Sequence, residues 1–335
     1  MLPRSSAGQD MSQSGGGTTA RGRAIRACGA AWIALAGWAV ATAIGAPPSA
    51  SVYNRSAPVR SADGADASEL AAQAERIVAS SLATLARAES VSLRMRQRVR
   101  IGDRVLVGTG RYLQAGRGEE QRFRLETTLT CDTESFELTE VSDGLFCWIH
   151  RRIGQNGPEF QRIDVQRVRA RLEELKVSDP SETAAYLGGL QRTLWWIRQW
   201  FWFDEAVTGE IEGRPVWLVT GKTPPAALGT VMPDLAESAA RPEGVRPEEL
   251  PDGWPWMVRL YVGKADLLPY RIEFLGIPGT RPVEPAEVEP IAVVDLVDIE
   301  LNGPVDAATF FYQPAAEGLI DITANHVNML APLRP

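Results

Sequence analysis

The side chains that most often carry catalysis are few in this sequence. It has only two histidines, His150 near the end of a predicted strand and His326 in the C-terminal tail. A Ser–His–Asp triad or a zinc site needs histidine beside other reactive groups, so neither is expected. Asp295, Asp298 and Glu300 are acidic neighbours, but strand alternation places the last two on one face and Asp295 on the other. That pattern is typical of a solvated or partly paired strand face.

Two glycine-containing stretches match phosphate-binding loops only in part. "GKT" at residues 221–223 follows a predicted strand, but a phosphate loop needs glycine where this chain has Val216. Pro224 and Pro225 also block the helix that must follow such a loop. "GTGRYL" at residues 108–113 lacks the last glycine of a dinucleotide loop. We therefore expect no catalytic residue, no metal and no cofactor. An enzyme, such as a sheet-based hydrolase, is the weakest of three functional hypotheses.

The charge of the chain argues against a nucleic-acid partner. The formal net charge is −7. Setting aside residues 1–46, which hold four arginines and one aspartate, leaves about −10. A nucleic-acid-binding protein shows a basic excess instead, so we expect no such partner.

The largest apolar side chains gather in "LWWIRQWFWF", residues 194–203, with four tryptophans and two phenylalanines. On a helix of about 100° per residue, one apolar stripe is enough to dock the helix on a sheet. That stripe comprises Leu187, Leu190, Leu194, Ile197 and Phe201. Trp196 and Trp200 form a second apolar patch away from it, and Trp195 lies between the two. Trp202 begins the next strand.

Three explanations for this second patch remain open. The tryptophans could pack under the loop at residues 223–252 or another helix, line a ligand cavity between helix and sheet, or contact a membrane or protein partner. The candidate cavity residues are Leu194, Trp195, Trp196, Ile197, Trp200 and Trp202.

The elements that position this segment indicate an α+β fold. A helix capped by Asp66 or Ser68 and running to about Glu89 leads the chain. About eleven alternating strands follow, joined by turns such as Asp143–Gly144. Two helices interrupt them, one capped by Asp164 and one starting at Pro180 and running toward Phe201. Hairpin-like connections predict an antiparallel sheet with one apolar face.

The first predicted strand has one strongly cationic face. In "VSLRMRQRVRI", apolar side chains alternate with Ser92, Arg94, Arg96, Arg98 and Arg100. These arginines are interpreted either as a solvated face paired with acids of adjacent strands or as a site for an anionic headgroup or partner.

The N-terminal region predicts export. Arg21, Arg23 and Arg26 precede the apolar run at residues 27–46, which ends in small residues. Residues 1–46 are therefore interpreted as an export signal or a retained membrane anchor. Residues 47–65 read as a linker, and residues 66–335 as one domain with a Pro-rich insertion at 223–252. The domain is expected in the periplasm or cell envelope.

The cysteines leave one question open. Cys28 opens the apolar run, whereas a lipid-modified cysteine must follow it. Cys131 and Cys147 could form a disulfide in an oxidising compartment or remain two separate buried thiols.

The order of elements, with several local patterns, resembles the LolA-like superfamily of cell-envelope proteins over roughly residues 66–330. The matching stretches are residues 68–101, "SDGLFCWIH" at 142–150, "GRPVWLVTG" at 213–221, "LPYRIEF" at 268–274 and "TFFYQPAAEGLIDIT" at 309–323. The resemblance implies a curved, half-open antiparallel sheet whose concave apolar face is covered by helices and holds acyl chains without catalysis. The Pro-rich insertion departs from this pattern, and no residue securely matches the family's helix-anchoring arginine.

The leading hypothesis is therefore a non-catalytic envelope protein that binds a lipid-like or acylated ligand in a gap between sheet and helices. Its partners would be lipid or lipoprotein acyl chains and, through the N-terminal segment, the inner membrane. The alternative is an envelope sensor or scaffold that uses the same fold for protein–protein interaction.

Overall fold

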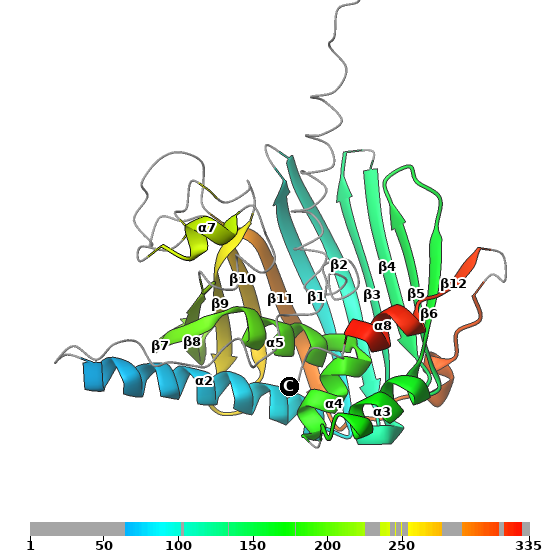
Figure 1. Cartoon of the computed structure of the whole chain (residues 1–335), viewed down its shortest axis with the longest axis horizontal. Coiled ribbons are helices and arrows are strands. Elements are labelled where there is room, and N and C mark those ends of the chain that lie inside the picture. Colours follow the sequence, from blue (N-terminus) through cyan, green and yellow to red (C-terminus); the bar gives the residue numbers. More distant parts are fainter. Residues whose placement is uncertain are drawn as a thin grey trace, which may run out of the picture.

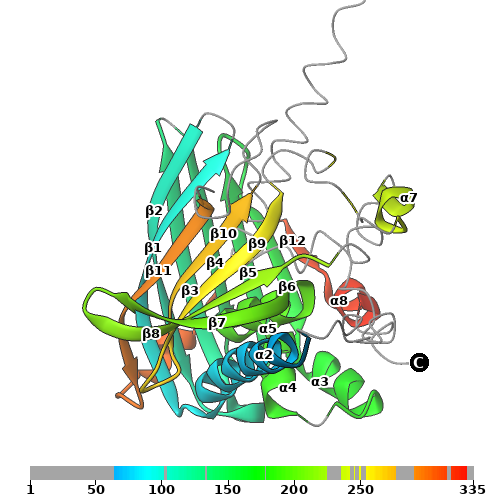
Figure 2. The ribbon, with the colours of Figure 1, turned by 90° about the vertical axis from the view of Figure 1, so that its left-hand side faces the viewer.

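The computed structural model describes residues 64–101, 104–132, 134–177, 179–224, 235–241, 245, 249, 254–276, 290–314 and 318–329. The described part is built on one open sheet of twelve strands, with helices packed against one face (Figure 1). Figure 2 shows this sheet curving around α2 (Gly64–Arg87) and α5 (Gly189–Trp200). The predicted α+β class is confirmed.

Eleven of the strands are those that the alternation of apolar and polar residues predicts. They are β1 (Ser90–Ile101), β2 (Arg104–Ala115), β3 (Arg122–Cys131), β4 (Glu134–Ser142), β5 (Phe146–Ile153), β6 (Glu159–Asp164), β7 (Trp202–Ile211), β8 (Arg214–Lys222), β9 (Pro255–Gly263), β10 (Pro269–Gly276) and β11 (Pro290–Leu301). The twelfth, β12 (Leu319–Asp321), is only three residues long, too short for a periodic signal.

The strand order is β12-β6-β5-β4-β3-β2-β1-β11-β10-β9-β8-β7. The neighbouring strands pair antiparallel, apart from β12, which pairs parallel with β6. The pairing of β1 with β11 joins the first half of the chain to the second within one sheet.

The remaining elements are helical. Besides α2 and α5 they are α3 (Val165–Glu174), α4 (Pro180–Leu187), α7 (Ala236–Ala239), α8 (Thr323–Met329) and the 3-10 turns η2 (Gly118–Glu120) and η6 (Ala307–Phe310). The predicted cap of α3 is confirmed, because the Arg167 backbone N–H donates to the Asp164 carboxylate at 3.1 Å.

The alternation of β1 separates the two faces of the sheet. Leu93 and Met95 are buried on the face toward the helices, here called the inner face, whereas Arg94 and Arg96 are exposed on the opposite, outer face. The inner face packs against α2 and α5 in one continuous core cluster. Burial of these apolar side chains is the main force that holds the layers together.

The helix predicted from Pro180 toward Phe201 is two helices instead of one. α4 ends at Leu187 and α5 starts at Gly189. Gly188 and Gly189 have φ of 126° and 71°, values that interrupt a right-handed helix and favour glycine. A Cβ at Gly189 would lie 2.7 Å from the Tyr112 hydroxyl oxygen. The break thus lets the start of α5 approach the sheet closely.

We expect Gly189→Ala to lower the free energy of unfolding by more than about 1 kcal/mol, since alanine is strained at positive φ and meets Tyr112. Urea unfolding of the full chain measures this. Gly213→Ala is the matched control, because Gly213 has φ of 77° and nothing within 4 Å of the added Cβ. An equal loss in both variants would show that contact with Tyr112 adds nothing to the backbone strain.

Part of the predicted domain organisation lies outside the described residues. This holds for residues 1–46, the expected signal or anchor, and for most of the linker and of the insertion at 223–252. Among the helices of the described part, none is both long and apolar enough to cross a membrane.

Candidate functional site

Helix α5 carries most of the residues that the sequence nominates for a ligand cavity. Leu194 and Ile197 are fully buried in the core cluster, as the predicted docking stripe requires. Trp195 and Trp200 are buried as well, and Trp196 is partly buried against the same cluster. Trp202 opens β7 and is 50% exposed. The structure therefore brings five of the six candidates together and leaves Trp202 outside.

An aromatic cluster connects α5 to the inner face of the sheet. The ring centroids of Trp196 and Trp200 are 5.6 Å apart, and the Trp196 ring meets Phe201 edge-on at 6.2 Å. Phe201 in turn lies 6.4 Å from Phe274 of β10. We call these four residues the aromatic cluster. Because Trp196 is only partly buried, the cluster runs from the core to a partly open edge.

Two of the tryptophans of α5 have an indole N–H that lies in the interior without an acceptor in the described part of the chain. They are Trp195 and Trp200. A buried indole N–H usually has a partner. An acceptor supplied by water or by the polar end of a ligand would therefore be favourable here.

Polar side chains fix the first turn of α5 to the sheet. The Tyr112 hydroxyl lies 2.9 Å from Gln114 Oε1 and 3.0 Å from Gln191 Oε1. The Gln191 amide donates to Gln114 Oε1, and Gln114 donates to the backbone oxygen of Leu85 at 3.4 Å. All three side chains are fully buried. Burial raises the pKa of the Tyr112 hydroxyl, which keeps it neutral.

A buried ion pair lies next to this network. The Arg192 guanidinium of α5 donates to Glu140 of β4, and both side chains are buried. Burial alone would lower the pKa of Arg192, but the Glu140 carboxylate more than offsets it, so the pKa is raised. Burial raises the pKa of the nearby Cys147 thiol, which makes it a poor nucleophile. The pair therefore anchors α5 and leaves the Cys147 thiol unactivated.

His326 of α8 is also buried beside this region. Its Nε2 lies 3.2 Å from the Tyr186 backbone oxygen. Burial, with help from the Arg192 charge, lowers the pKa of His326 to about 4. The ring is neutral near pH 7 and acts as a structural donor. Within the described residues, no group of three or more His, Cys, Asp or Glu side chains could hold a metal ion.

The polar anchor of α5 was not predicted from the sequence. One feature of the sequence did indicate a buried polar contact. Alternation in "SFELTEV" places Glu140 on the same face as Phe136 and Leu138. An acid at an inward position needs a buried partner. That partner, Arg192, is distant along the chain and could not be identified from spacing.

The two cysteines of the described chain stay apart as free, buried thiols. Cys131 pairs with Glu134 at one end of β4, and Cys147 pairs with Ser142 at the other end. The whole length of β4 separates them, so the disulfide alternative is not formed and the two-thiol alternative holds in this structure.

Comparison with known proteins gives similarity of fold only. No protein-family model and no curated protein matches the sequence. A chain in the complex structure of Pseudomonas aeruginosa MucA/MucB matches with 13% identity and a TM-score of 0.33, covering 72% of this chain but only 61% of that one. LprF from Mycobacterium bovis matches with 10% identity and a TM-score of 0.34, covering 70% of this chain and 96% of LprF.

A putative outer membrane lipoprotein-sorting protein domain from Vibrio parahaemolyticus matches with 9% identity and a TM-score of 0.27, covering 72% of this chain and 97% of that domain. Identities this low transfer neither ligands nor partners.

Proposed function

We propose that this chain is a non-catalytic protein of the cell envelope that binds an apolar or acyl-chain ligand against the inner face of the sheet, in a gap beside α5. One observation carries the proposal: the inner face stays apolar beyond the described helices that cross it. These helices lie across one half of the long strands, whose other ends extend past them (Figure 1).

The side chains on the extended half have the chemistry that an acyl chain requires. Val99, Leu106, Leu129 and Leu138 come from four neighbouring strands and all belong to the core cluster. An apolar sheet face needs a second apolar layer. The four side chains are at most 3% exposed in the structure, so a hydrocarbon chain would have to enter this apolar layer next to the helices, which it can do without demanding hydrogen bonds. The aromatic cluster, with the partly buried Trp196, would border such a chain.

The proposed location follows from the N-terminal sequence. The basic flank and the apolar run at residues 27–46 favour export and association with the inner membrane. A protein in that place meets lipids and the acyl chains of lipoproteins, which makes them the proposed ligand class.

A second candidate function has one observation in its favour. Four of the predicted cavity residues, Leu194, Trp195, Ile197 and Trp200, are already buried by protein. A gap filled in this way would suit an envelope sensor or scaffold that recognises another protein.

Native mass spectrometry of the full chain purified from membranes separates the two functions. We expect a lipid adduct that is released on collisional activation, and saturable binding of a fluorescent fatty-acid probe that unlabelled fatty acid displaces. A lipid-free mass without probe binding would reject the ligand proposal. A protein that co-purifies in defined stoichiometry with the lipid-free chain would favour the second function instead.

A further inference from the structure

The outer face of β1 and β2 has an excess of positive charge. Residues 90–115 contain six arginines and one aspartate, in a chain whose net charge is −7. Arg94 lies directly opposite Arg111 in the β1–β2 register. Like charges in directly opposed positions destabilise a sheet. The stability of the fold therefore gives no reason for this arrangement.

The acids next to these arginines already have other partners. Asp295 lies opposite Arg96 in the register, but Arg271 binds it at 2.5 Å. Glu126 lies opposite Arg111, but Arg124 binds it at 2.6 Å.

Three arginines are therefore left over. Within the described residues, the side chains of Arg96, Arg98 and Arg111 make neither an ion pair nor a hydrogen bond to an acid. Arg94 does pair with Asp298, but both side chains are more than half exposed. Such a pair contributes little.

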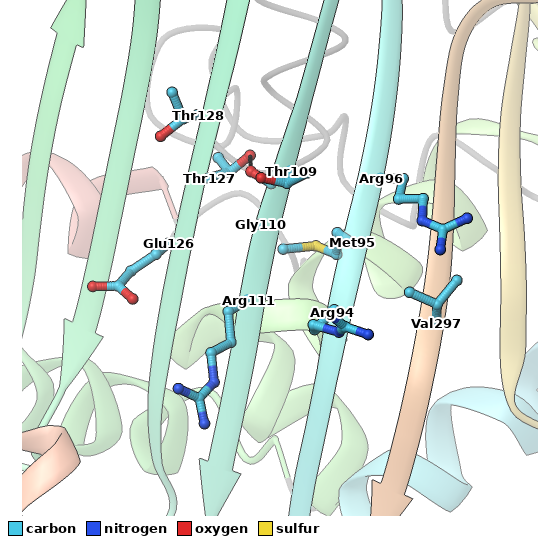
Figure 3. A pocket seen from close by; sticks show the side chains of 10 residues that line it. All are labelled: Arg94, Met95, Arg96, Thr109, Gly110, Arg111, Glu126, Thr127, Thr128 and Val297. Carbon is cyan, nitrogen blue, oxygen red and sulfur yellow. Dashed lines mark hydrogen bonds between the residues drawn. The ribbon is translucent and has the colours of Figure 1, made fainter.

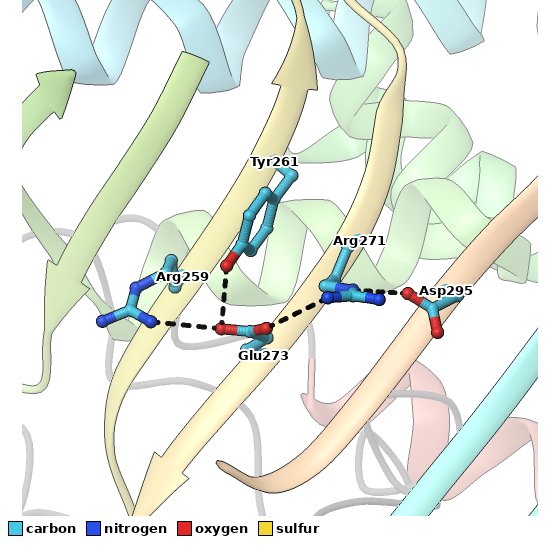
Figure 4. Close-up of polar contacts among 5 residues, drawn as sticks. All are labelled: Arg259, Tyr261, Arg271, Glu273 and Asp295. Carbon is cyan, nitrogen blue, oxygen red and sulfur yellow. Dashed lines mark hydrogen bonds and ion pairs between the residues drawn. The ribbon is translucent and has the colours of Figure 1, made fainter. Parts of the chain in front are cut away.

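The neighbouring part of the outer face is balanced in charge. Across β9, β10 and β11, Arg259, Glu273, Arg271 and Asp295 alternate in sign (Figure 4). The Tyr261 hydroxyl lies 3.3 Å from the Glu273 carboxylate. This ladder ends at Asp295, and β1 lies directly beyond it. The cationic excess is thus local to β1 and β2.

Two of the three surplus arginines, Arg96 and Arg111, border a groove of about 410 Å³ on this face (Figure 3). Thr109 and Thr128 are opposite each other in the β2–β3 register and line the groove together with Arg94, Arg96 and Arg111. Hydroxyl and guanidinium donors of this kind suit phosphate oxygens.

Exposed valines continue the same face toward the β1–β2 hairpin. Val107, 52% exposed, lies opposite Arg98, and Val105, 43% exposed, lies opposite Arg100. Arginine beside exposed aliphatic side chains suits a lipid interface, where the cations meet headgroup phosphates and the apolar groups enter the acyl boundary. An acidic protein would match the arginines but would not require the valines.

We propose that the outer face of β1–β3 docks on a membrane surface that contains anionic phospholipids. This surface is distinct from the proposed ligand gap, which lies on the inner face. The two proposals can therefore fail independently.

The test is flotation of the full chain with vesicles of phosphatidylcholine alone or with added phosphatidylglycerol. The variants are Arg96→Glu/Arg98→Glu, Val105→Ser/Val107→Ser and a control, Arg87→Glu/Arg167→Glu, which reverses two exposed helical arginines. Residues 1–63 are identical in every variant. Their contribution to vesicle binding therefore cancels when the variants are compared with the parent protein.

An arginine near an anionic surface contributes about fivefold to affinity. We therefore expect Arg96→Glu/Arg98→Glu to weaken binding to anionic vesicles at least about 25-fold, and the control pair to change it much less. Added salt should weaken the parent protein's binding. Val105→Ser/Val107→Ser should weaken binding to both kinds of vesicle. The melting temperature of each variant should remain close to that of the parent protein, which shows that the variants are folded.

Three results would overturn the proposal. Equal binding of the parent protein to both kinds of vesicle would remove the role of headgroup charge. An equal loss in the control pair would show an effect of net charge alone. Complete competition by polyglutamate, with the valine variant unaffected, would identify an acidic protein as the partner instead.

Discussion

Glu140→Gln should lower the free energy of unfolding by about 3–5 kcal/mol, because it leaves Arg192 buried without its carboxylate. Arg192 is 5% exposed and Glu140 is 1% exposed, so water cannot replace the lost charge. Glutamine keeps the size of the side chain and can still accept a hydrogen bond, which separates the loss of charge from a packing defect. Urea unfolding at neutral pH measures the effect.

The second ion pair of α5 provides a matched control. Arg198 binds Glu75 of α2 at 2.6 Å, but these side chains are about one quarter exposed. Glu75→Gln should therefore change the unfolding free energy by only about 1 kcal/mol or less. An equal loss in both variants would contradict the view that Arg192 is desolvated.

A double replacement that removes both charges tests whether the unpaired charge of Arg192 is the cause of the lost stability. Arg192→Met/Glu140→Leu removes both charges and keeps apolar volume, so it should recover most of the stability lost in Glu140→Gln. A double variant as unstable as the single one would show that the hydrogen bonds, and not the unpaired charge, decide the effect.

The sequence predicted the sheet well because strand alternation is a local signal. The arginine-rich β1, the helix α2 and the Asp164 cap of α3 all follow from neighbours within a few residues. The break at Gly188–Gly189 depends on close approach to Tyr112 and Phe123 of distant strands. Local periodicity carries no information about such an approach.

The candidate site was predicted only in part for a related reason. A single docking stripe was expected for the Trp-rich helix, and packing of Trp200 against another helix was one of three explanations left open. In the structure α5 packs against α2 as well as the sheet. A helix covered on two sides needs a wider apolar arc, so Trp200 is buried. The buried Arg192–Glu140 pair required knowledge of which strand lies under α5.

The three tryptophans at residues 196, 200 and 202 should separate stability from ligand binding. Trp200 is 4% exposed in the core, so Trp200→Ala should lower the unfolding free energy by about 3–5 kcal/mol. Trp202 is half exposed at the start of β7, so Trp202→Ala should change both stability and probe binding little.

Trp196→Ala is the decisive variant, because Trp196 lies at the partly open edge of the aromatic cluster. If this edge borders the proposed ligand, removing the Trp196 ring should lower the free energy of fatty-acid probe binding by more than it lowers the free energy of unfolding. The stability of Trp196→Ala should lie between those of the Trp202 and Trp200 variants, since a partly buried ring removes less apolar surface from water than a fully buried ring does. Thermal unfolding and probe titration on all three full-length variants make the comparison. A Trp196→Ala protein that is as unstable as Trp200→Ala, yet binds the probe like the parent, would reduce Trp196 to packing and remove it from the ligand site.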